Sequence, residues 1–386
     1  MPRYDDYSVV YHLVGGEVLP IFISALQFPK ETKHILIVTG NPEADVPSNL
    51  KMTLMERHIE THVWSLGDTK TGWDFKKLDV EITRRLQEDA NRYGDGRRCM
   101  DITGGTKPMA LTSLRVAQAA GIPVMYIDTS DRKSLWLGQE IEEEPLCNKM
   151  KLAEYFLLRG LKPQFSPDAA PPSQRLLDFM YRKRDIVYQH LKTYEEMGVK
   201  TLRKTIFEKF FQELIQDEQW SSEEWEQYSQ EAFWTSLKWK ERRGFLQGMW
   251  FEYYVYAALE TSPEITEKVH SLSIYDGKKK LQEFDIIYTD GFSMRIVECK
   301  AGALEQNFFH KLASQCKMFS GALEVAAMAT ALPLGEVLKA EALKERVKKE
   351  KEVGVFCGKE GIGCLKQSLF SFGGKRFYPA IGEGIA

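Results

Sequence analysis

Long hydrophobic runs are missing from this sequence. Its most apolar early stretch, residues 13–28, is interrupted by two glycines, a glutamate and a proline, so it is too short and too broken to span a bilayer. The first six residues include a proline, an arginine and two aspartates and do not have the pattern of a signal peptide. We therefore expect a cytoplasmic protein that does not use a membrane.

Cysteine is also scarce. The chain has six cysteines among 386 residues, with no CxxC motif and no spacing typical of metal ligands. This argues against a disulfide-stabilised secreted domain and against a zinc module. We expect reduced, buried thiols, and we expect Cys299 to point away from the site described below.

An excess of positive charge is lacking as well. The 52 basic and 55 acidic residues give a formal charge of −3, which excludes a generally basic protein that coats nucleic acids. Any polynucleotide must be held by a local patch. The length suits two domains, and a hydrophobic content of 43% is enough for packed cores.

Two common phosphate-binding motifs, GxGxxG and GxxxxGK[ST], do not occur. The first half of the sequence instead alternates strand and helix patterns. Strands are expected at residues 7–14, 34–39, 62–66, 98–102 and 122–128, with a sixth at 134–137, and helices at 19–27, 50–59, 75–92 and 107–119. Such an alternation with short connections predicts an α/β domain with a mainly parallel, doubly wound sheet.

Small residues and hydroxyls follow several of these strands. Gly15 and Gly16 come after the first strand, the segment 101–107 (Asp-Ile-Thr-Gly-Gly-Thr-Lys) after the fourth, and residues 128–130 after the fifth. Backbone N–H groups in such loops approach an anion closely, and Thr106-Lys107 would open a helix with its positive end. A phosphate-bearing ligand fits this edge. The alternative is that the glycines only form tight turns.

A hairpin pattern in the second half carries charged residues. Two β-rich runs flank Asp290-Gly291, which predicts a two-residue loop. Asp285, Glu298 and Lys300 then project from one face of the hairpin. Two carboxylates beside an ammonium group are suited to a divalent cation and phosphodiester cleavage. The alternative is an ordinary solvated hairpin face.

One more carboxylate falls on a helical pattern. Residues 245–259 predict a helix whose apolar stripe is Phe245, Met249, Tyr256 and Leu259, and Glu252 lies on that stripe. A carboxylate among apolar residues needs compensation. A metal shared with Asp285 and Glu298 would provide it, and so would an arginine partner or a place at the helix edge.

The proline-rich segment 163–172 is the best candidate for a domain boundary. We expect domains at residues 1–165 and 243–386, joined by a helical connector at 166–242. Further elements are expected as helices at 173–195, 200–217, 223–238, 303–318 and 334–349, and strands at 323–328 and 353–357.

Together the two halves resemble a known arrangement. The segment 101–107 after the fourth strand is similar to the signature of the CRISPR-associated Rossmann fold (CARF). The constellation of Glu252, Asp285 and Glu298-Cys299-Lys300 resembles the active site of the PD-(D/E)xK nucleases, whose domain has a restriction-endonuclease-like α/β fold. Their order in one chain resembles the CRISPR ancillary nucleases of type III immunity, over essentially the whole sequence.

This resemblance implies an activator, a metal and a partner. The CARF domain would bind a cyclic oligoadenylate across a homodimer interface, and cyclic tetra-adenylate is the expected ring. Mg²⁺ or Mn²⁺ would be held by Asp285 and Glu298 with help from Glu252, and Lys300 would orient water and stabilise charge. The substrate would be single-stranded RNA or DNA, or duplex DNA. The activator contacts carried over by position are Thr103, Gly104, Gly105, Thr106 and Lys107, with Gly15, Gly16, Thr39 and Thr129 as weaker candidates.

Two other functions remain open at this stage. Arg184 and His190 fit the loose R-x(4–6)-H pattern of HEPN ribonucleases, which cleave RNA without a metal. The chain could also be a non-catalytic sensor in which the messenger drives nucleic-acid binding and the nuclease fold is degenerate. Intact Asp285, Glu298 and Lys300 argue against that alternative.

Overall fold

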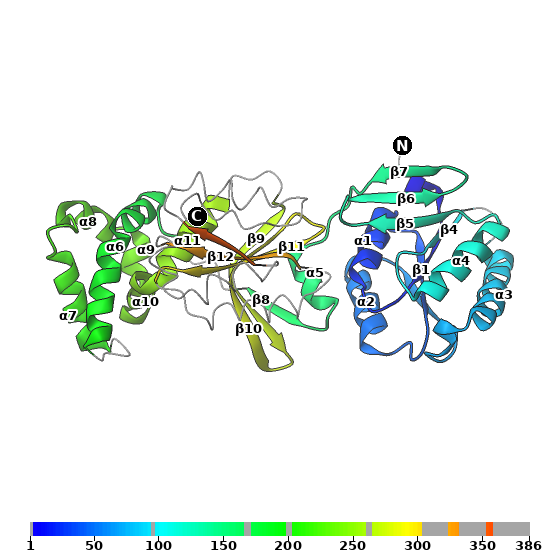
Figure 1. Ribbon diagram of the computed structural model, residues 1–386, viewed down its shortest axis with the longest axis horizontal. Coiled ribbons are helices and arrows are strands. Elements are labelled where there is room, and N and C mark those ends of the chain that lie inside the picture. Colours follow the sequence, from blue (N-terminus) through cyan, green and yellow to red (C-terminus); the bar gives the residue numbers. More distant parts are fainter. Residues whose placement is uncertain are drawn as a thin grey trace, which may run out of the picture. The chain divides into compact units, whose positions relative to one another are not determined.

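The computed structural model describes residues 3–93, 97–165, 171–197, 203–259, 265–302, 323–331 and 353–357. The chain divides into two compact units (Figure 1). Unit 1 consists of Met1–Pro163 with the short segments Ile274–Leu281 and Thr289–Met294, and unit 2 consists of Gln164–Ser273, Gln282–Tyr288 and Arg295–Ala386. Each unit contains its own sheet.

The sheet of unit 1 has seven strands in the order β3-β2-β1-β4-β5-β6-β7. Strands β1 to β5 pair in parallel, and β6 and β7 add an antiparallel edge. The bounds are β1 Val9–Leu13, β2 Lys33–Val38, β3 Thr61–Ser65, β4 Arg98–Asp101, β5 Val124–Asp128, β6 Lys133–Leu137 and β7 Ile141–Pro145. The predicted doubly wound, mainly parallel sheet is confirmed.

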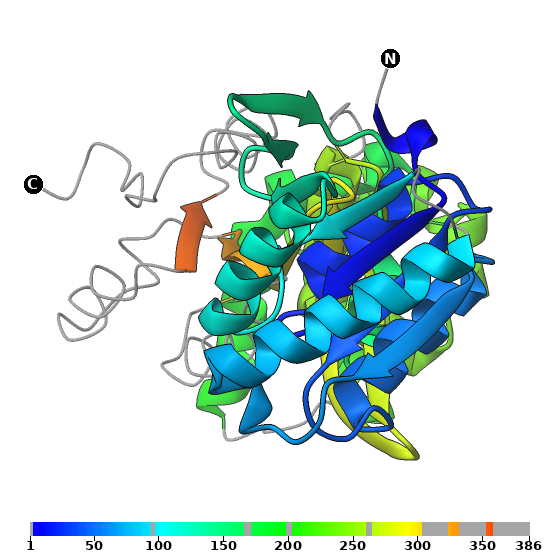
Figure 2. The ribbon, with the colours of Figure 1, turned by 90° about the vertical axis from the view of Figure 1, so that its right-hand side faces the viewer.

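Helices cover both faces of this sheet. Figures 1 and 2 show α1 and α2 on one face and α3 and α4 on the other. Leu78, Ile82 and Leu86 are buried at four-residue spacing on α3, which is the apolar stripe that packs a helix on a sheet. The bounds are η1 Arg3–Asp6, α1 Leu19–Gln27, α2 Asp45–Glu56, η2 Thr71–Trp73, α3 Phe75–Tyr93, α4 Lys107–Ala119 and α5 Leu152–Leu157.

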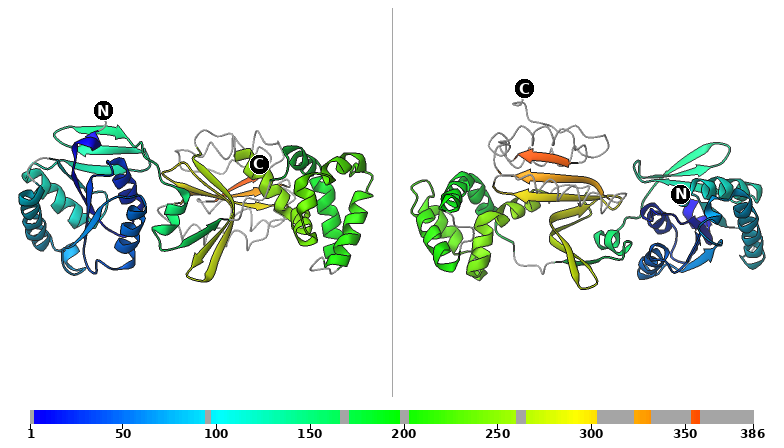
Figure 3. Two further views of the ribbon diagram at one scale, coloured as in Figure 1. Left: turned by 180° about the vertical axis from the view of Figure 1, so that it is seen from behind. Right: turned by 60° about the horizontal axis from the view of Figure 1, so that its bottom comes forward.

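Unit 2 combines a group of helices with a six-stranded sheet of order β13-β12-β11-β10-β9-β8 (Figure 3). One hydrophobic core includes Phe179 of α6, Phe210 of α7, Phe251 of α11 and Val297 of β11. The helices that follow the proline-rich segment therefore share a core with this sheet. The bounds are β8 Lys162–Phe165, α6 Gln174–Glu196, α7 Lys204–Ile215, α8 Ser222–Ser229, α9 Ala232–Ser236, α10 Trp239–Gly244, η3 Phe245–Met249, α11 Trp250–Ala258, β9 Glu267–Asp276, β10 Lys279–Thr289, β11 Met294–Lys300, β12 Leu323–Thr330 and β13 Val353–Cys357.

The structure bears on the expected absence of membrane spans and on the expected burial of the cysteines. Within the described ranges, no helix is both long and apolar enough to cross a bilayer. Cys99 and Cys299 are buried free thiols, but Cys147 is exposed, so the expectation that the thiols are buried is wrong for Cys147. It lies two residues after the end of the edge strand β7.

Candidate functional sites

The β10–β11 hairpin has a different turn from the predicted one. Four residues, 290–293, connect Thr289 to Met294, so the predicted two-residue loop is wrong. The reason is the Asp290 carboxylate, whose Oδ1 accepts the backbone N–H groups of Phe292 and Ser293, both at 2.9 Å. This side-chain turn replaces a tight backbone turn. Asp285 lies four residues before the end of β10, and Glu298 lies four residues after the start of β11. Counted from the turn, the two residues therefore lie at the same position along the hairpin.

Three oxygen atoms from this hairpin surround the Lys300 ammonium group. Lys300 Nζ donates to Glu298 Oε1 and to the Cys299 carbonyl, both at 2.9 Å, and lies 3.5 Å from Asp285 Oδ2. Asp285 Oδ2 also accepts the Cys299 N–H at 2.7 Å. The structure therefore brings Asp285, Glu298 and Lys300 together on one face. Cys299 itself points into the hydrophobic core, as expected.

Burial and like charge perturb the acids of this cluster. Burial, with Glu298 and Glu252 adding negative charge, raises the pKa of Asp285 to about 7. For Lys300, burial alone would lower the pKa, but the carboxylates of Asp285 and Glu298 outweigh it, so its pKa is raised. Lys300 is therefore a permanent cation at neutral pH in this arrangement.

Glu252 approaches the cluster from the helix side. Its Oε2 lies 3.2 Å from His270 Nε2 on β9, and His270 stacks on Tyr253 with ring centroids 4.3 Å apart. The Glu252 side chain is 25% exposed, so it lies at the edge of the helix, which was one of the predicted alternatives. His270 was not predicted, because nothing in the local pattern of β9 marks it.

The predicted apolar stripe of this helix is wrong in phase. The buried positions of α11 are Trp250, Phe251, Tyr254, Val255 and Ala258, whereas Met249 and Tyr256 are only half-buried. The cause is the π-helical turn η3, in which Gly248 has non-helical backbone angles. A π turn inserts a residue and rotates the face that follows it.

The donor atoms of the cluster fit a hard cation in part. Within the described residues, no group of three His, Cys, Asp or Glu side chains is arranged to hold a metal ion. The predicted trio of Asp285, Glu298 and Glu252 is therefore not assembled as a three-carboxylate site. Two carboxylates and the Cys299 main-chain carbonyl gather around the Lys300 ammonium group, and such oxygen atoms are the donors that Mg²⁺ and Mn²⁺ prefer.

The loops of unit 1 that were predicted to bind a phosphate also converge. A Cβ added to Gly15 would lie 2.9 Å from the Gly105 nitrogen, and one added to Gly104 would lie 1.9 Å from the Leu13 carbonyl oxygen. These are close backbone approaches between the loops after β1 and β4. A Cβ added to Gly72 of η2 would lie 3.0 Å from Thr39 Oγ1 after β2, so η2 joins the same cluster.

Thr106 fixes the start of helix α4 at this edge. Its Oγ1 donates to the Gly72 carbonyl at 2.5 Å and accepts the Met109 N–H at 3.3 Å. The positive end of the thirteen-residue helix α4 therefore faces the loops. Gly16 and Lys107 are exposed here, and Thr129 is half-buried after β5.

A buried polar chain supports the loop after β4. Asp101 Oδ1 accepts the Thr103 N–H at 2.9 Å and the Thr103 hydroxyl, and Thr103 Oγ1 accepts the Ile127 N–H at 2.8 Å. Asp101 Oδ2 lies 2.8 Å from His12 Nδ1, and His12 Nε2 lies 2.9 Å from His34 Nδ1. Burial lowers the pKa of His34, with His12 adding to the effect. His12 and His34 were not singled out from the sequence.

The structure separates the two residues of the HEPN alternative. Arg184 Nη1 donates to the Tyr181 carbonyl at 2.7 Å, and its guanidinium lies 4.4 Å from the Tyr181 ring centroid. His190 Nε2 lies 3.0 Å from Asp217 Oδ2. Six residues apart on α6, the two side chains differ by about 120° around the helix axis. Each of the two side chains thus contacts other residues, and the HEPN alternative stays a prediction. The helices expected at 303–318 and 334–349 lie outside the described residues.

Comparisons with known proteins match both halves of the chain. Residues 14–155 match the family described as Card1 CARF domain, and residues 239–358 match the family described as Card1-like, endonuclease domain. Among solved structures, protein VC1899 from Vibrio cholerae has a TM-score of 0.70 at 16% identity, covering 95% of this chain and 99% of that one.

Two further structures are similar in fold. Can2 from Sulfobacillus thermosulfidooxidans, solved in complex with cyclic tetra-adenylate, has a TM-score of 0.66 at 18% identity, covering 94% of this chain and 98% of its own. A type III CRISPR defence DNA nuclease activated by cyclic oligoadenylate has a TM-score of 0.53 at 16% identity, covering 85% of this chain and 46% of its own. No curated protein matches the chain.

Proposed function

We propose that this chain is a metal-dependent nuclease activated by a cyclic oligoadenylate, because it belongs to the family that joins a Card1-type CARF domain to a Card1-like endonuclease domain. The observation that carries the proposal is the cluster on β10 and β11. Oxygen atoms of Asp285, Glu298 and the Cys299 carbonyl gather around the Lys300 ammonium group. Carboxylates that can hold a metal ion and a cation that can stabilise phosphate charge are the groups that phosphodiester hydrolysis requires.

The metal would be held by Asp285, Glu298 and the Cys299 carbonyl, with Glu252 nearby. A bound Mg²⁺ or Mn²⁺ supplies an activated water and neutralises phosphate charge. Glu298 is 2% exposed, so its carboxylate is held in place by its surroundings. Asp285 is fixed by the Cys299 N–H. Both acids are thus preorganised on adjacent strands.

Lys300 would stabilise negative charge on the phosphate. Its raised pKa keeps the ammonium protonated at neutral pH, and a protonated amine cannot accept a proton from water. We therefore assign Lys300 to charge stabilisation and orientation, and not to general base catalysis. Single-stranded RNA or DNA, or duplex DNA, would be the substrate.

The loops of unit 1 would bind the activator. Can2, which is similar in fold, was solved with cyclic tetra-adenylate, and this ring is the activator that we propose. Thr103, Gly104, Gly105 and Thr106 lie beside the positive end of α4, where backbone N–H groups can approach an anion closely. The hydroxyls of Thr103 and Thr106 donate within the loops and hold them in place. A two-fold symmetric ring suits a homodimer in which each chain presents the same loops.

A cleavage assay tests this proposal. Labelled single-stranded RNA, single-stranded DNA and plasmid are incubated with Mn²⁺, with and without cyclic tetra-adenylate. We expect cleavage that needs both Mn²⁺ and the ring and that stops with EDTA. Glu298→Gln and Lys300→Ala should each lose about 100-fold or more in rate. The control Asp276→Asn removes an exposed carboxylate of β9 and should cleave like the parent. Cleavage by both site variants at the parental rate would contradict the nuclease assignment.

A further inference from the structure

The turn between β10 and β11 belongs to unit 1, although the catalytic residues of these two strands lie in unit 2. Thr289–Met294 is part of unit 1, whereas Gln282–Tyr288 and Arg295–Lys300 belong to unit 2. Asp285 lies four residues before Thr289, and Glu298 lies four residues after Met294. At about 3.3 Å per residue, each acid is about 13 Å along its strand from the turn.

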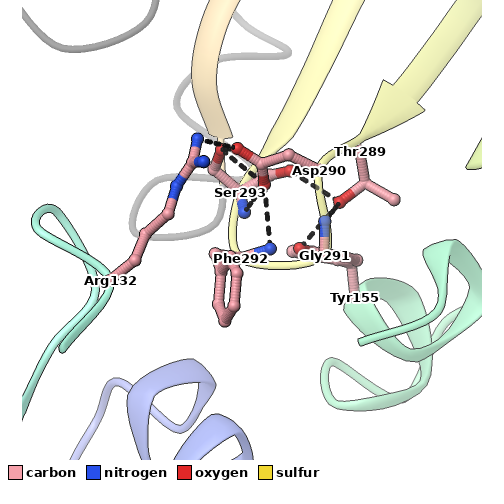
Figure 4. Close-up of polar contacts among 7 residues, drawn as sticks. All are labelled: Arg132, Tyr155, Thr289, Asp290, Gly291, Phe292 and Ser293. Carbon is pink, nitrogen blue, oxygen red and sulfur yellow. Dashed lines mark hydrogen bonds and ion pairs between the residues drawn. The ribbon is translucent and has the colours of Figure 1, made fainter. Parts of the chain in front are cut away.

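Four consecutive residues of this turn bind the segment 132–155 of unit 1. Figure 4 shows Arg132 and Tyr155 reaching the turn from opposite sides. The Tyr155 hydroxyl lies 2.9 Å from Thr289 Oγ1, and Arg132 Nη2 donates to Asp290 Oδ2 at 2.5 Å. The Gly291 carbonyl accepts the Met150 N–H at 2.9 Å. The Arg132 guanidinium lies 5.8 Å from the Phe292 ring centroid.

The central residues of the turn permit little change. Asp290 is 1% exposed, so its charge depends on Arg132 and on the N–H groups within the turn. Gly291 has a φ of +93°, and a Cβ at this position would lie 2.5 Å from the Lys149 side chain. Only glycine fits there without displacing that side chain. The turn is therefore held as a unit against its neighbours.

Arg132 comes from a loop that also belongs to the activator edge. The β5–β6 turn runs from Asp128 to Lys133 and contains Thr129, one of the proposed activator contacts. Asp128 Oδ1 accepts the N–H groups of Ser130 and Asp131 at 3.0 and 3.1 Å. This compact turn links Thr129 to Arg132 through three peptide units, so a shift at one residue moves the other.

We infer that Arg132 and Asp290 are positioning residues that place the strands of Asp285 and Glu298 under the control of the β5–β6 turn. The inference rests on the proposed function. A ligand that moves the β5–β6 turn would move the Asp290 turn with it, because the ion pair between Arg132 and the buried Asp290 carboxylate joins them. Strand β10 ends at that turn and β11 begins there, so the distance between the Asp285 and Glu298 carboxylates would change with it.

The ratio of cleavage rates with and without activator separates this role from a purely structural one. A residue that only stabilises the fold would lower both rates alike. Arg132→Gln removes the ion pair and leaves the N–H bonds within the Asp290 turn intact. Arg132→Lys keeps the charge. Lys133→Gln is the matched control, because Lys133 is the next residue and binds Asp131 and Glu143 instead.

The experiment uses the full chain with Mn²⁺ and cyclic tetra-adenylate as the probe. We expect Arg132→Gln to bind the ring with a Kd within about twofold of the parent, while its activation ratio falls about tenfold or more. Arg132→Lys should recover part of the ratio, and Lys133→Gln should keep all of it. Hydrogen exchange in peptides covering residues 282–300 should respond to the ring in the parent and no longer in Arg132→Gln.

Three outcomes would overturn the inference. An unchanged activation ratio in Arg132→Gln shows that the contact is not used. A Kd that weakens in step with activity shows that Arg132 serves ligand binding and not positioning. A parent protein that neither binds nor responds to the ring refutes the proposed function, and the inference falls with it. Because the last outcome is seen in the parent, the two failures are distinguishable. If Arg132→Gln melts below the assay temperature, Arg132→Lys and Asp290→Asn give the same comparison.

Discussion

Asp285 shows how strongly single residues of this site depend on their surroundings. Its carboxyl is buried beside Glu298, and its pKa is raised to about 7 although Lys300 lies 3.5 Å away. Desolvation and the neighbouring acids therefore outweigh the ammonium group. Because a metal ligand must be deprotonated, cation binding at this carboxyl would compete with protonation.

This raised pKa has a consequence for stability. A carboxyl whose pKa is higher in the folded chain than its usual 3.8 holds its proton longer in the folded state. Its contribution to the free energy of unfolding is therefore complete below about pH 4 and is lost as the pH rises to about 7. We expect Asp285→Asn to raise the melting temperature at pH 8 in EDTA, by roughly 2–4 °C for each kcal/mol relieved.

Thermal melts at pH 5 and pH 8 in EDTA check this expectation. The gain of Asp285→Asn over the parent should be larger at pH 8, and adding Mn²⁺ should stabilise the parent more than the variant. Asp276→Asn serves as the control, because that carboxylate is exposed. Equal melting temperatures for parent and variant at pH 8 would mean that burial and the neighbouring acids do not destabilise the charged Asp285 carboxylate.

At the scale of elements, the sequence predicted those strands and helices that bury a continuous apolar pattern. Strand β1 is buried at all five positions, and such a run is recognisable without knowing its partners. Strand β7 has the sequence Ile-Glu-Glu-Glu-Pro with exposed side chains. Its pairing with β6 holds it, and that pairing leaves no local pattern. Strands β8 and β9 were not predicted either, although Leu272 and Ile274 of β9 are buried.

The cluster on β10 and β11 was predictable for a related reason. Asp285, Glu298 and Lys300 lie on strands that are consecutive in the sequence, so residue alternation alone places them on one face. Two contributions could not be read in this way. The Cys299 carbonyl is a backbone atom without a residue signature, and the contact of Glu252 with His270 joins a helix to a strand 18 residues away. The phase of α11 was missed because the π turn leaves no pattern that we recognised.

The close approach of loops in unit 1 predicts a sharp difference between two glycines. A Cβ at Gly104 would lie 1.9 Å from the Leu13 carbonyl oxygen and 2.7 Å from the Ile21 side chain, whereas a Cβ at Gly16 would meet nothing within 4 Å. Gly104→Ala must therefore push the β4–α4 loop away from β1. We expect it to lose both activator binding and about 1–3 kcal/mol of stability.

Gly16→Ala is the matched control for this substitution. Its melting temperature should equal that of the parent, since the new methyl group enters open space. Calorimetric melts and titration with cyclic tetra-adenylate measure the two effects. A Gly104→Ala protein that melts and binds like the parent would show that the loops after β1 and β4 are not packed as described.

At the scale of the whole molecule, the near-balanced charge makes recognition a local matter. With a formal charge of −3, the chain offers a polyanionic ring no general attraction, so binding must come from directed donors. One chain contributes one set of such donors, around the positive end of α4. Cyclic tetra-adenylate has four equivalent phosphates, and two identical sets related by a two-fold axis match it better than one.

A binding site shared by two chains fixes the stoichiometry of the complex. Titration of the full chain with cyclic tetra-adenylate should saturate at about one ring for every two chains, and the complex should have the mass of two chains in sedimentation. Linear tetra-adenylate carries the same bases without the closed, symmetric ring, so it should bind more weakly. Saturation at one ring per chain, with the mass of a single chain, would contradict a shared binding site. It would leave the nuclease cluster unaffected, because Asp285, Glu298 and Lys300 all come from one chain.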